Sequence, residues 1–337
     1  MKSARPSLMS CRATWFVTAL LMLTTTTAAC SGGRSDASSG ATRTVTDVEG
    51  TEVSVPVHPE RVVTLSEPTL DAVIALGIEP IGTVAGRGQS TVPAYLADRA
   101  GDLPVLGGVA QPNYEAIGMA KPDLILVDGT SINNNADAMA ALRHIAPTVY
   151  TGYAGGSWRS NFEIVADALN MTAEGETVTA EYDAHVAEVK AGLGGFAGKT
   201  FSIVRWQGGS ASLILKELPP GTALADLGLA RPANQDKNGR GHSEPVSLEN
   251  LQDIDADYMF FGTLGGSSVD NPQAGGVADS AAADKALAGA VDAPGFTQLR
   301  AYRDDHIITV DGSAWTSTGG PILMNRIIDD VQKALVK

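Results

Sequence analysis

Cysteine is nearly absent from this sequence, since Cys11 and Cys30 are the only two among 337 residues. Cys11 precedes an apolar run at 15–23, which reads as a secretory signal and is too short for a stable membrane span. Removal of residues 1–29 leaves Cys30 as the single thiol, so no disulfide can form within the mature chain. The mature protein therefore depends on its hydrophobic core, which a chain of this length can supply.

Positive charge is also scarce, with 24 Lys and Arg against 38 Asp and Glu and a formal net charge of −14. The signal carries Lys2, Arg5 and Arg12 and no acidic residue, so its loss makes the charge −17. This balance argues against nucleic acid as a partner. An anionic small ligand remains compatible, because a few arginines in a cleft create a local positive field.

Signatures of catalysis are missing as well. The sequence contains no nucleophile elbow, no phosphate-binding loop and no zinc-binding helix motif, and the mature chain has no free cysteine nucleophile. The five histidines are scattered, which disfavours a site for a bare transition metal. We therefore expect no enzyme and no intrinsic cofactor, with a secreted enzyme as the distant alternative.

The end of the signal indicates lipid attachment. Small residues at 27–29 precede Cys30, as in a bacterial lipobox, although Thr27 stands where Leu is usual. An ordinary secretory signal is the alternative. The Ser/Gly-rich stretch at 31–41 predicts a flexible tether. The expected segments are a signal peptide at 1–29, a lipidated tether at 30–43, an N-terminal lobe at 44–172, an interlobe helix at 173–195 and a C-terminal lobe at 196–337.

Two segments of the chain repeat one pattern. Asn113-Tyr114-Glu115 and Ser247-Leu248-Glu249 each start a short amphipathic helix with a capping residue. Asp123 and Asp257 follow eight residues after the respective glutamates, and each then leads into an apolar strand. One copy in each half of the chain predicts two similar lobes with a ligand cleft between them.

The pattern of apolar residues predicts an α/β fold. A hairpin is expected at 44–57, and strand, helix and strand at 62–65, 69–76 and 78–84 suggest a parallel sheet. A charged amphipathic helix at 177–193 is followed by a new strand. A helix of about 20 residues spans roughly 30 Å, enough to bridge two lobes.

Candidate ligand residues follow from the rule that open parallel sheets bind ligands at the carboxyl ends of their strands. Arg87, between two glycines, lies at such an end, with a solvated surface arginine as the alternative. Arg205-Trp206 also ends a strand, and both arginines suit an anion. Arg231 is a weaker candidate, with a surface charge as the alternative. Aromatic residues in Gly-rich loops are further candidates, with packing of the loop on its own lobe as the alternative; these are Tyr153, Trp158 and Trp315.

Several short motifs together resemble one family. They are His58-Pro59-Glu60-Arg61-Val62-Val63, Leu76-Gly77-Ile78-Glu79-Pro80-Ile81-Gly82, Pro112-Asn113-Tyr114-Glu115, Lys121-Pro122-Asp123-Leu124-Ile125 and Asp305-His306-Ile307-Ile308-Thr309-Val310-Asp311 with Trp315. In this order, behind a lipobox, they resemble the substrate-binding lipoproteins of ABC importers for ferric siderophores, including the ferrichrome, ferric dicitrate, haem and cobalamin binding proteins. The resemblance covers nearly all of the mature chain.

The resemblance implies two Rossmann-like lobes with central parallel sheets, joined by one long rigid helix with little closure on binding (a class III solute-binding protein). It implies capture of a ferric siderophore, whose iron arrives in the ligand's own cage without direct protein ligands. Haem or cobalamin is the alternative ligand, and Tyr153 or His242 would then be candidates to ligate haem iron.

The resemblance also implies partners. Glu115 and Glu249 match the glutamates that dock each lobe of such proteins onto arginines of the membrane permease. The alternative is that each only complements a helix macrodipole. We expect a monomer outside the cytoplasm, anchored to the membrane by lipid on Cys30 and serving a permease with its ATPase.

Overall fold

Two groups of strands organise the chain in a computed structural model, which describes residues 40–132, 135–239, 243–264 and 277–336. The signal at 1–29, the lipidation site Cys30 and most of the tether lie outside the described residues. In the parts of the chain that are described, no helix combines the length and apolar character needed to cross a membrane.

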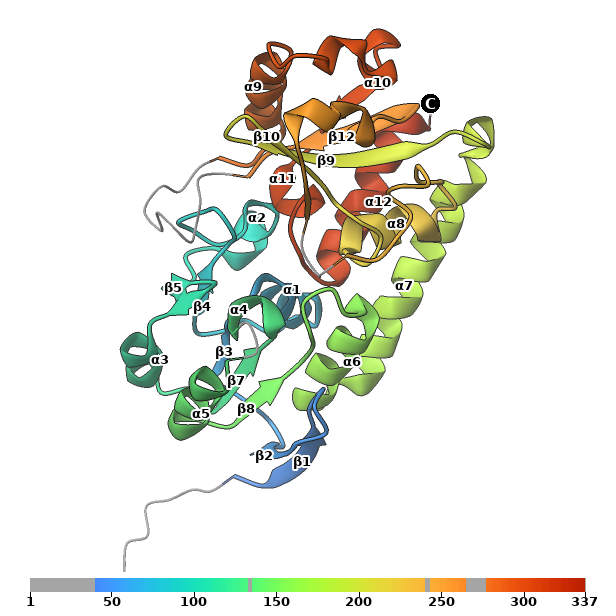
Figure 1. Ribbon diagram of the computed structural model, residues 1–337. Helices are drawn as coiled ribbons and strands as arrows, with labels where there is room; N and C mark the ends of the chain where they lie inside the picture. The colour runs from blue at the N-terminus through green and yellow to red at the C-terminus, as the bar shows by residue number, and fades with distance from the viewer. Residues whose placement is uncertain (1–39, 133–134, 240–242, 265–276, 337) are drawn as a thin grey trace, which may run out of the picture. The chain divides into compact units, whose positions relative to one another are not determined.

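The first lobe contains a hairpin and parallel strands flanked by helices (Figure 1). Its elements are β1 (Thr42–Thr46), β2 (Glu52–Pro56), β3 (Val62–Thr64), α1 (Glu67–Ala75), β4 (Thr83–Ala85), η1 (Ala94–Leu96), α2 (Ala97–Ala100), β5 (Val105–Gly108), β6 (Gln111–Pro112), α3 (Tyr114–Ala120), β7 (Leu124–Val127), α4 (Gly129–Ile132), α5 (Ala136–Ile145), β8 (Thr148–Tyr150) and α6 (Trp158–Ala168). The predicted hairpin is present, and its first strand begins at Thr42.

Strands β3, β7 and β8 are parallel and buried on both faces. Successive side chains of a strand point to opposite faces, so β7 contributes to two separate cores. Leu124 and Leu126 pack in the core that contains α6, whereas Ile125 and Val127 pack in the core that contains α3 and α5. Helices on both faces explain why these strands are continuously apolar.

The second lobe is a mixed five-stranded sheet in the order β11-β10-β9-β12-β13. Its elements are η2 (Gly194–Phe196), β9 (Phe201–Gln207), β10 (Ser210–Leu213), α8 (Pro219–Asp226), β11 (Glu244–Val246), η3 (Leu248–Ile254), β12 (Tyr258–Gly262), α9 (Ser280–Ala290), η4 (Phe296–Gln298), α10 (Arg300–Arg303), β13 (Ile307–Thr309), α11 (Gly312–Trp315) and α12 (Pro321–Leu335). Strands β9, β12 and β13 are parallel, as the resemblance to the binding-protein family implied for each lobe.

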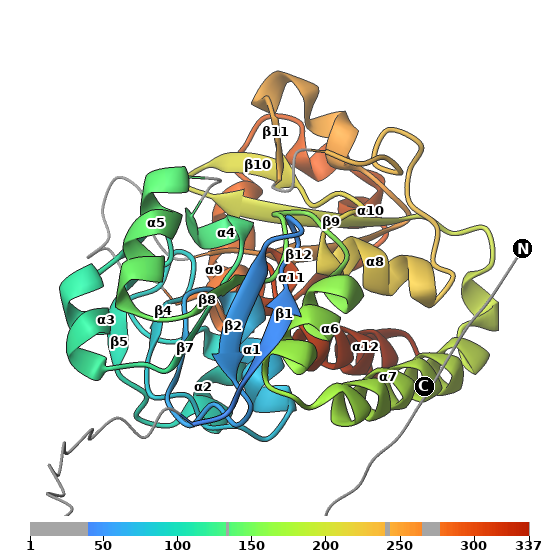
Figure 2. The same cartoon turned by 90° about the horizontal axis from the view of Figure 1, so that it is seen from below.

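The long helix α7 (Thr172–Ala191) packs against α6 of the first lobe and α12 of the second (Figures 1 and 2). Its 20 residues begin five positions before the predicted helix and correspond to about 30 Å. Tyr182 of α7 contacts the Trp158 ring edge-on at 5.1 Å and donates a hydrogen bond to Asp226 at 2.8 Å. One side chain therefore joins both lobes. The lobe boundaries at 172/173 and 195/196 remain a proposal.

The repeated aspartates hold the starts of neighbouring strands. Asp123, just before β7, accepts hydrogen bonds from the backbone N–H groups of Glu60 and Arg61, which precede β3. Asp257, just before β12, accepts from the backbone N–H and the hydroxyl of Thr200, which precedes β9. The two copies of the sequence repeat therefore share a structural role, since the aspartate of each copy connects two neighbouring strands. Its two helices differ, because α3 is regular, whereas η3 is a 3-10 segment broken at Asn250.

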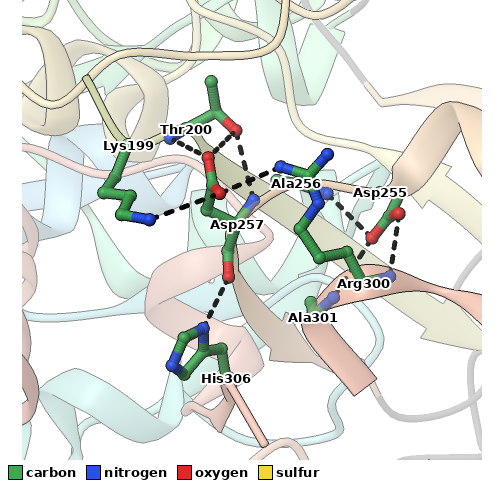
Figure 3. Close-up of polar contacts among 8 residues, drawn as sticks. All are labelled: Lys199, Thr200, Asp255, Ala256, Asp257, Arg300, Ala301 and His306. Carbon is green, nitrogen blue, oxygen red and sulfur yellow. Dashed lines mark hydrogen bonds and ion pairs between the residues drawn. The ribbon is translucent and has the colours of Figure 1, made fainter. Parts of the chain in front are cut away.

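Figure 3 shows how Asp257 is surrounded. Arg300 pairs with its carboxylate at 3.0 Å, and Lys199 lies 3.8 Å away. The hydrogen bonds from Thr200, together with these cations, lower the pKa of Asp257 to about 2. A folded-state pKa below the unfolded value of about 3.9 stabilises the protein above that pH, and the contribution is lost as the pH falls towards 2.

We therefore expect Asp257→Asn to lower the free energy of unfolding by about 1–2 kcal/mol at pH 7 and by much less near pH 2. Urea unfolding at several pH values measures the difference. Asp253→Asn removes an exposed carboxylate nearby and should leave the pH profile unchanged. Parallel wild-type and Asp257→Asn profiles between pH 4 and pH 2 would contradict this expectation.

Candidate anion-binding cavity between the lobes

A cavity of about 200 Å³ lies where the two lobes meet. The first lobe contributes Arg87, from the loop after β4, and the second lobe contributes Arg205, near the end of β9. The remaining lining residues come from the second lobe and are Leu218, Ser243, Thr316, Ser317 and Thr318. The structure therefore brings together the two arginines that the strand-end rule selected, 118 positions apart in the sequence.

A tight turn presents Arg87. The Gly86 N–H donates to the carbonyl of Thr91 at 2.8 Å, and the Gln89 N–H donates to the carbonyl of Gly86 at 3.0 Å. Gly88 has φ +69°, a left-handed conformation that glycine adopts without a steric penalty. The flanking glycines therefore form the turn at whose apex the arginine sits.

The two guanidinium groups make the cavity electropositive. Burial, followed by repulsion from Arg87, lowers the pKa of Arg205 to about 10, so the group remains protonated at neutral pH. Arg205 donates through Nη2 to the Ser243 hydroxyl. Arg87 Nη2 is buried, and no hydrogen-bond partner for it exists among the described residues. Among the described residues that line the cavity, none is acidic. The cavity therefore has unused donors and positive charge, which suit an anionic ligand.

A buried carboxylate that the sequence analysis missed accepts hydrogen bonds from residues that line this cavity. Glu67, 1% exposed, accepts a hydrogen bond from the Arg87 backbone N–H at 2.7 Å. It also accepts from the Ser317 hydroxyl at 2.9 Å and the Thr318 hydroxyl at 3.3 Å. The strand-end rule could have found it, because Glu67 follows β3 just as Arg87 follows β4.

Asp71 ties the lobes together beside this cavity. Its carboxylate accepts from the backbone N–H groups of Ile322 and Leu323, both at 2.9 Å, at the start of α12 in the second lobe. Tyr95 donates its hydroxyl to the same carboxylate at 3.0 Å. Burial raises the pKa of Asp71 to about 6, and burial likewise raises the pKa of Asp128 to about 6. Asp71 thus connects α1 of the first lobe with the start of α12 in the second.

The tryptophan predictions require correction. Trp206 is 4% exposed and packs against Phe261 and Phe296, because it points to the sheet face opposite Arg205. Trp315 is fully buried, stacks on Phe260 at 4.2 Å, and donates to Asp330 at 2.9 Å. Neither ring has a surface to offer a ligand, so both are core residues.

Arg231 also belongs to the interior of the second lobe. It donates through Nη2 to the Ile214 carbonyl at 2.7 Å and to Gln235 at 3.1 Å, and burial lowers its pKa to about 10. It does not line the cavity of Arg87 and Arg205. This cavity gives Arg231 no contact with a ligand, and its role in binding stays a prediction.

Tyr153 and Trp158 line a second, much smaller cavity of about 20 Å³, which shares Thr318 with the first. Tyr153 is 44% exposed and is available to a ligand, whereas Trp158 is 4% exposed and packs on Tyr182. Their role in binding stays a prediction. His242 lies outside the described residues. In the described part of the chain, no group of three His, Cys, Asp or Glu residues is arranged to hold a metal ion.

Glu115 and Glu249 are both exposed, in the first turns of α3 and η3. No ion pair recorded among the described residues includes either of them. Their side chains are therefore open to a partner, and docking stays a prediction.

Two Rossmann-like α/β lobes, a bridging helix and a cavity between the lobes with an arginine from each are the features of a binding protein for a small ligand. This is the fold that the sequence analysis predicted. The chain belongs to the periplasmic binding protein family, whose model matches residues 62–314. It is 30% identical over 328 residues, or 96% of each chain, to the "probable siderophore-binding lipoprotein YfiY" of Bacillus subtilis.

Further similarities agree with this membership. The petrobactin-binding protein YclQ of Bacillus subtilis is 25% identical, with 95% of this chain and 96% of the relative covered. The solved structure of Staphylococcus aureus SirA complexed with staphyloferrin B has a TM-score of 0.70 at 23% identity. It covers 87% of this chain and 98% of SirA, which demonstrates the shared fold. The family comprises substrate-binding proteins of transporters rather than enzymes.

Proposed function

We propose that this protein is the extracytoplasmic substrate-binding component of an ABC importer and captures a ferric siderophore between its lobes. The pair Arg87 and Arg205, brought from different lobes to one cavity, is the observation that carries the proposal. The names of relatives that bind siderophores support it, since one of them matches this chain over nearly its whole length. The iron would be enclosed by the ligand, so the protein needs to recognise only the ligand's outer surface.

The chemistry of the lining favours one class of ligand. Two guanidinium groups and several hydroxyls line the cavity, whereas Trp206 and Trp315 are unavailable for stacking. Guanidinium groups bind carboxylate oxygens in a bidentate manner, and hydroxyls add further donors. A ferric complex with exposed carboxylate or hydroxamate oxygens therefore fits better than one that presents flat aromatic rings.

Anchoring and delivery complete the proposal. Lipid on Cys30 would hold the protein at the outer surface of the membrane, and Glu115 and Glu249 would dock one lobe each onto a permease that works with its ATPase. The protein would act as a monomer, because the repeat places one docking glutamate on each lobe of a single chain.

Titration against a panel of ligands tests the binding function. We expect purified protein to bind an anionic ferric citrate or citrate–hydroxamate complex, with affinity measured by calorimetry, and to bind iron-free forms more weakly. Haem and cobalamin serve as the alternative ligands, and haem bound through Tyr153 would shift its Soret band. Failure of every ferric siderophore to bind would contradict the proposal, and binding of haem alone would favour the alternative.

A further inference from the structure

Glu67 is an unusual residue to find beside an anion-binding cavity. It is the first residue of α1, and its side chain is almost completely buried. A buried carboxylate is costly unless its oxygens accept hydrogen bonds or meet a cation. None of the ion pairs recorded in the described ranges includes Glu67. Its charge is therefore balanced by hydrogen bonds rather than by a nearby cation.

Those hydrogen bonds reach both sides of the cavity. The Arg87 backbone N–H, 2.7 Å from Oε1, belongs to the first lobe. The Ser317 hydroxyl donates to the same oxygen, and the Thr318 hydroxyl donates to Oε2, both from the second lobe. Arg87, Ser317 and Thr318 all line the cavity, whereas Glu67 lies behind them. One side chain thus holds two cavity walls, Arg87 and Ser317, that are 230 positions apart in the sequence.

The charge of Glu67 acts on the ligand as well. Arg87 and Arg205 place two positive charges on the lining, and Glu67 places one negative charge directly behind it. In a partly buried site, charges interact more strongly than in water. A highly anionic complex is therefore repelled by Glu67 while it is attracted by the arginines. A helix-dipole role at the start of α1 would require the carboxylate but not its contacts with the second lobe.

We propose that Glu67 is a positioning and specificity-determining residue of this cavity, which joins its two walls and sets how much negative charge the bound complex can carry. This inference rests on the proposed function of the cavity as the site for a ferric complex. Replacement by glutamine separates the two roles. Glutamine keeps an oxygen that accepts from Arg87 and Ser317, and its amide can donate to the Thr318 hydroxyl, while the charge is removed.

The test compares Glu67→Gln and Glu67→Ala with wild type against two ferric complexes of different charge. We expect Glu67→Gln to bind anionic ferric citrate about tenfold more tightly and an uncharged ferric trihydroxamate within about twofold of wild type. Glu67→Ala should weaken binding of the uncharged trihydroxamate by about tenfold, because the walls lose their connection, and should leave ferric citrate near its wild-type affinity, because the lost charge offsets that loss. Asp47→Asn, which changes a buried carboxylate in the turn after β1, should leave both affinities unchanged.

Equal changes for both complexes in Glu67→Gln, or weaker binding of ferric citrate alone, would overturn the charge role. Wild-type affinity of Glu67→Ala for the uncharged trihydroxamate would overturn the positioning role, and if that variant does not fold, Glu67→Gln decides the proposal. Binding of iron-free citrate, measured by its effect on thermal stability, is a separate experiment. If no ferric complex binds wild type, the proposed function fails; Glu67 then keeps its role only if Glu67→Gln binds citrate about tenfold more tightly than wild type.

Discussion

Arg205→Gln is expected to weaken binding of an anionic ferric complex by about 100-fold, or about 3 kcal/mol. Arg205 approaches the cavity from the second lobe, and its charge is largely shielded from water there. Glutamine retains a donor but loses the positive charge and the planar fork that binds two carboxylate oxygens together. Arg87→Gln should also weaken binding, because Arg87 contributes the second positive charge of the cavity, from the first lobe.

The same substitution is expected to stabilise the ligand-free protein. Two guanidinium groups repel each other across the cavity, and burial disfavours the charge of Arg205. Removing one of them relieves both effects, so the melting temperature should rise or stay constant while affinity falls. This combination excludes misfolding as the reason for lost binding. It is typical of sites that retain strain for function.

Arg231→Gln provides a matched control. Arg231 is equally buried in the second lobe but contacts Ile214 and Gln235 instead of the cavity. The control should therefore lower stability and leave affinity within about twofold, the reverse of Arg205→Gln. Calorimetric titration and thermal unfolding of the three proteins measure both quantities. Wild-type affinity in Arg205→Gln would remove the central support for the anion-binding cavity.

The contrast between Arg205 and its neighbour Trp206 shows how far the sequence could predict this site. The strand-end rule located Arg205, because it depends only on where an apolar strand ends. Trp206 is the next residue of the same strand and therefore points to the opposite face, so alternation alone could have separated it from Arg205. Trp315 stacks on Phe260, a contact between β12 and α11 that requires the tertiary fold.

Glu67 and Asp71 show which contacts of the site could not be predicted from the sequence. Both follow the first parallel strand, yet their partners lie about 250 positions away, at the start of α12 and in the segment before it. A single sequence contains no trace of such pairing. The repeat was more informative, because Asp123 and Asp257 hold adjacent strands in the same way in each lobe. Local periodicity thus predicts lobes and strands, whereas contacts between lobes require the structure.

Charge reversal at Glu115 and Glu249 together is expected to reduce uptake of the ferric ligand at least tenfold while ligand affinity stays unchanged. Both side chains are exposed in first helical turns, and both lie away from the residues that line the cavity. Lysine at these positions would repel the basic residues of a permease that accepts acidic side chains. Stability should change by less than about 1 kcal/mol, mainly through the helix macrodipole.

Comparing single and double charge-reversal variants tests whether the protein docks onto the permease at two points. If each lobe holds the permease by one glutamate, either reversal alone should reduce uptake moderately, and the double reversal should reduce it by about the product of the single effects. Uptake of radiolabelled iron complex by cells that contain the cognate permease measures transport, and calorimetry on purified proteins measures affinity.

Glu174→Lys separates docking from the macrodipole. Glu174 is also exposed in a first helical turn, that of α7, but lies outside the repeat. Its reversal imposes the same helix-dipole penalty and should leave uptake unchanged. Equal loss of uptake in Glu174→Lys would trace the effect to helix stability or to general surface charge. Normal uptake in the double variant would show that these glutamates only complement their helices. Loss of uptake confined to the repeat positions would identify the two segments as the docking points, because each single reversal there changes the net charge by the same amount as Glu174→Lys.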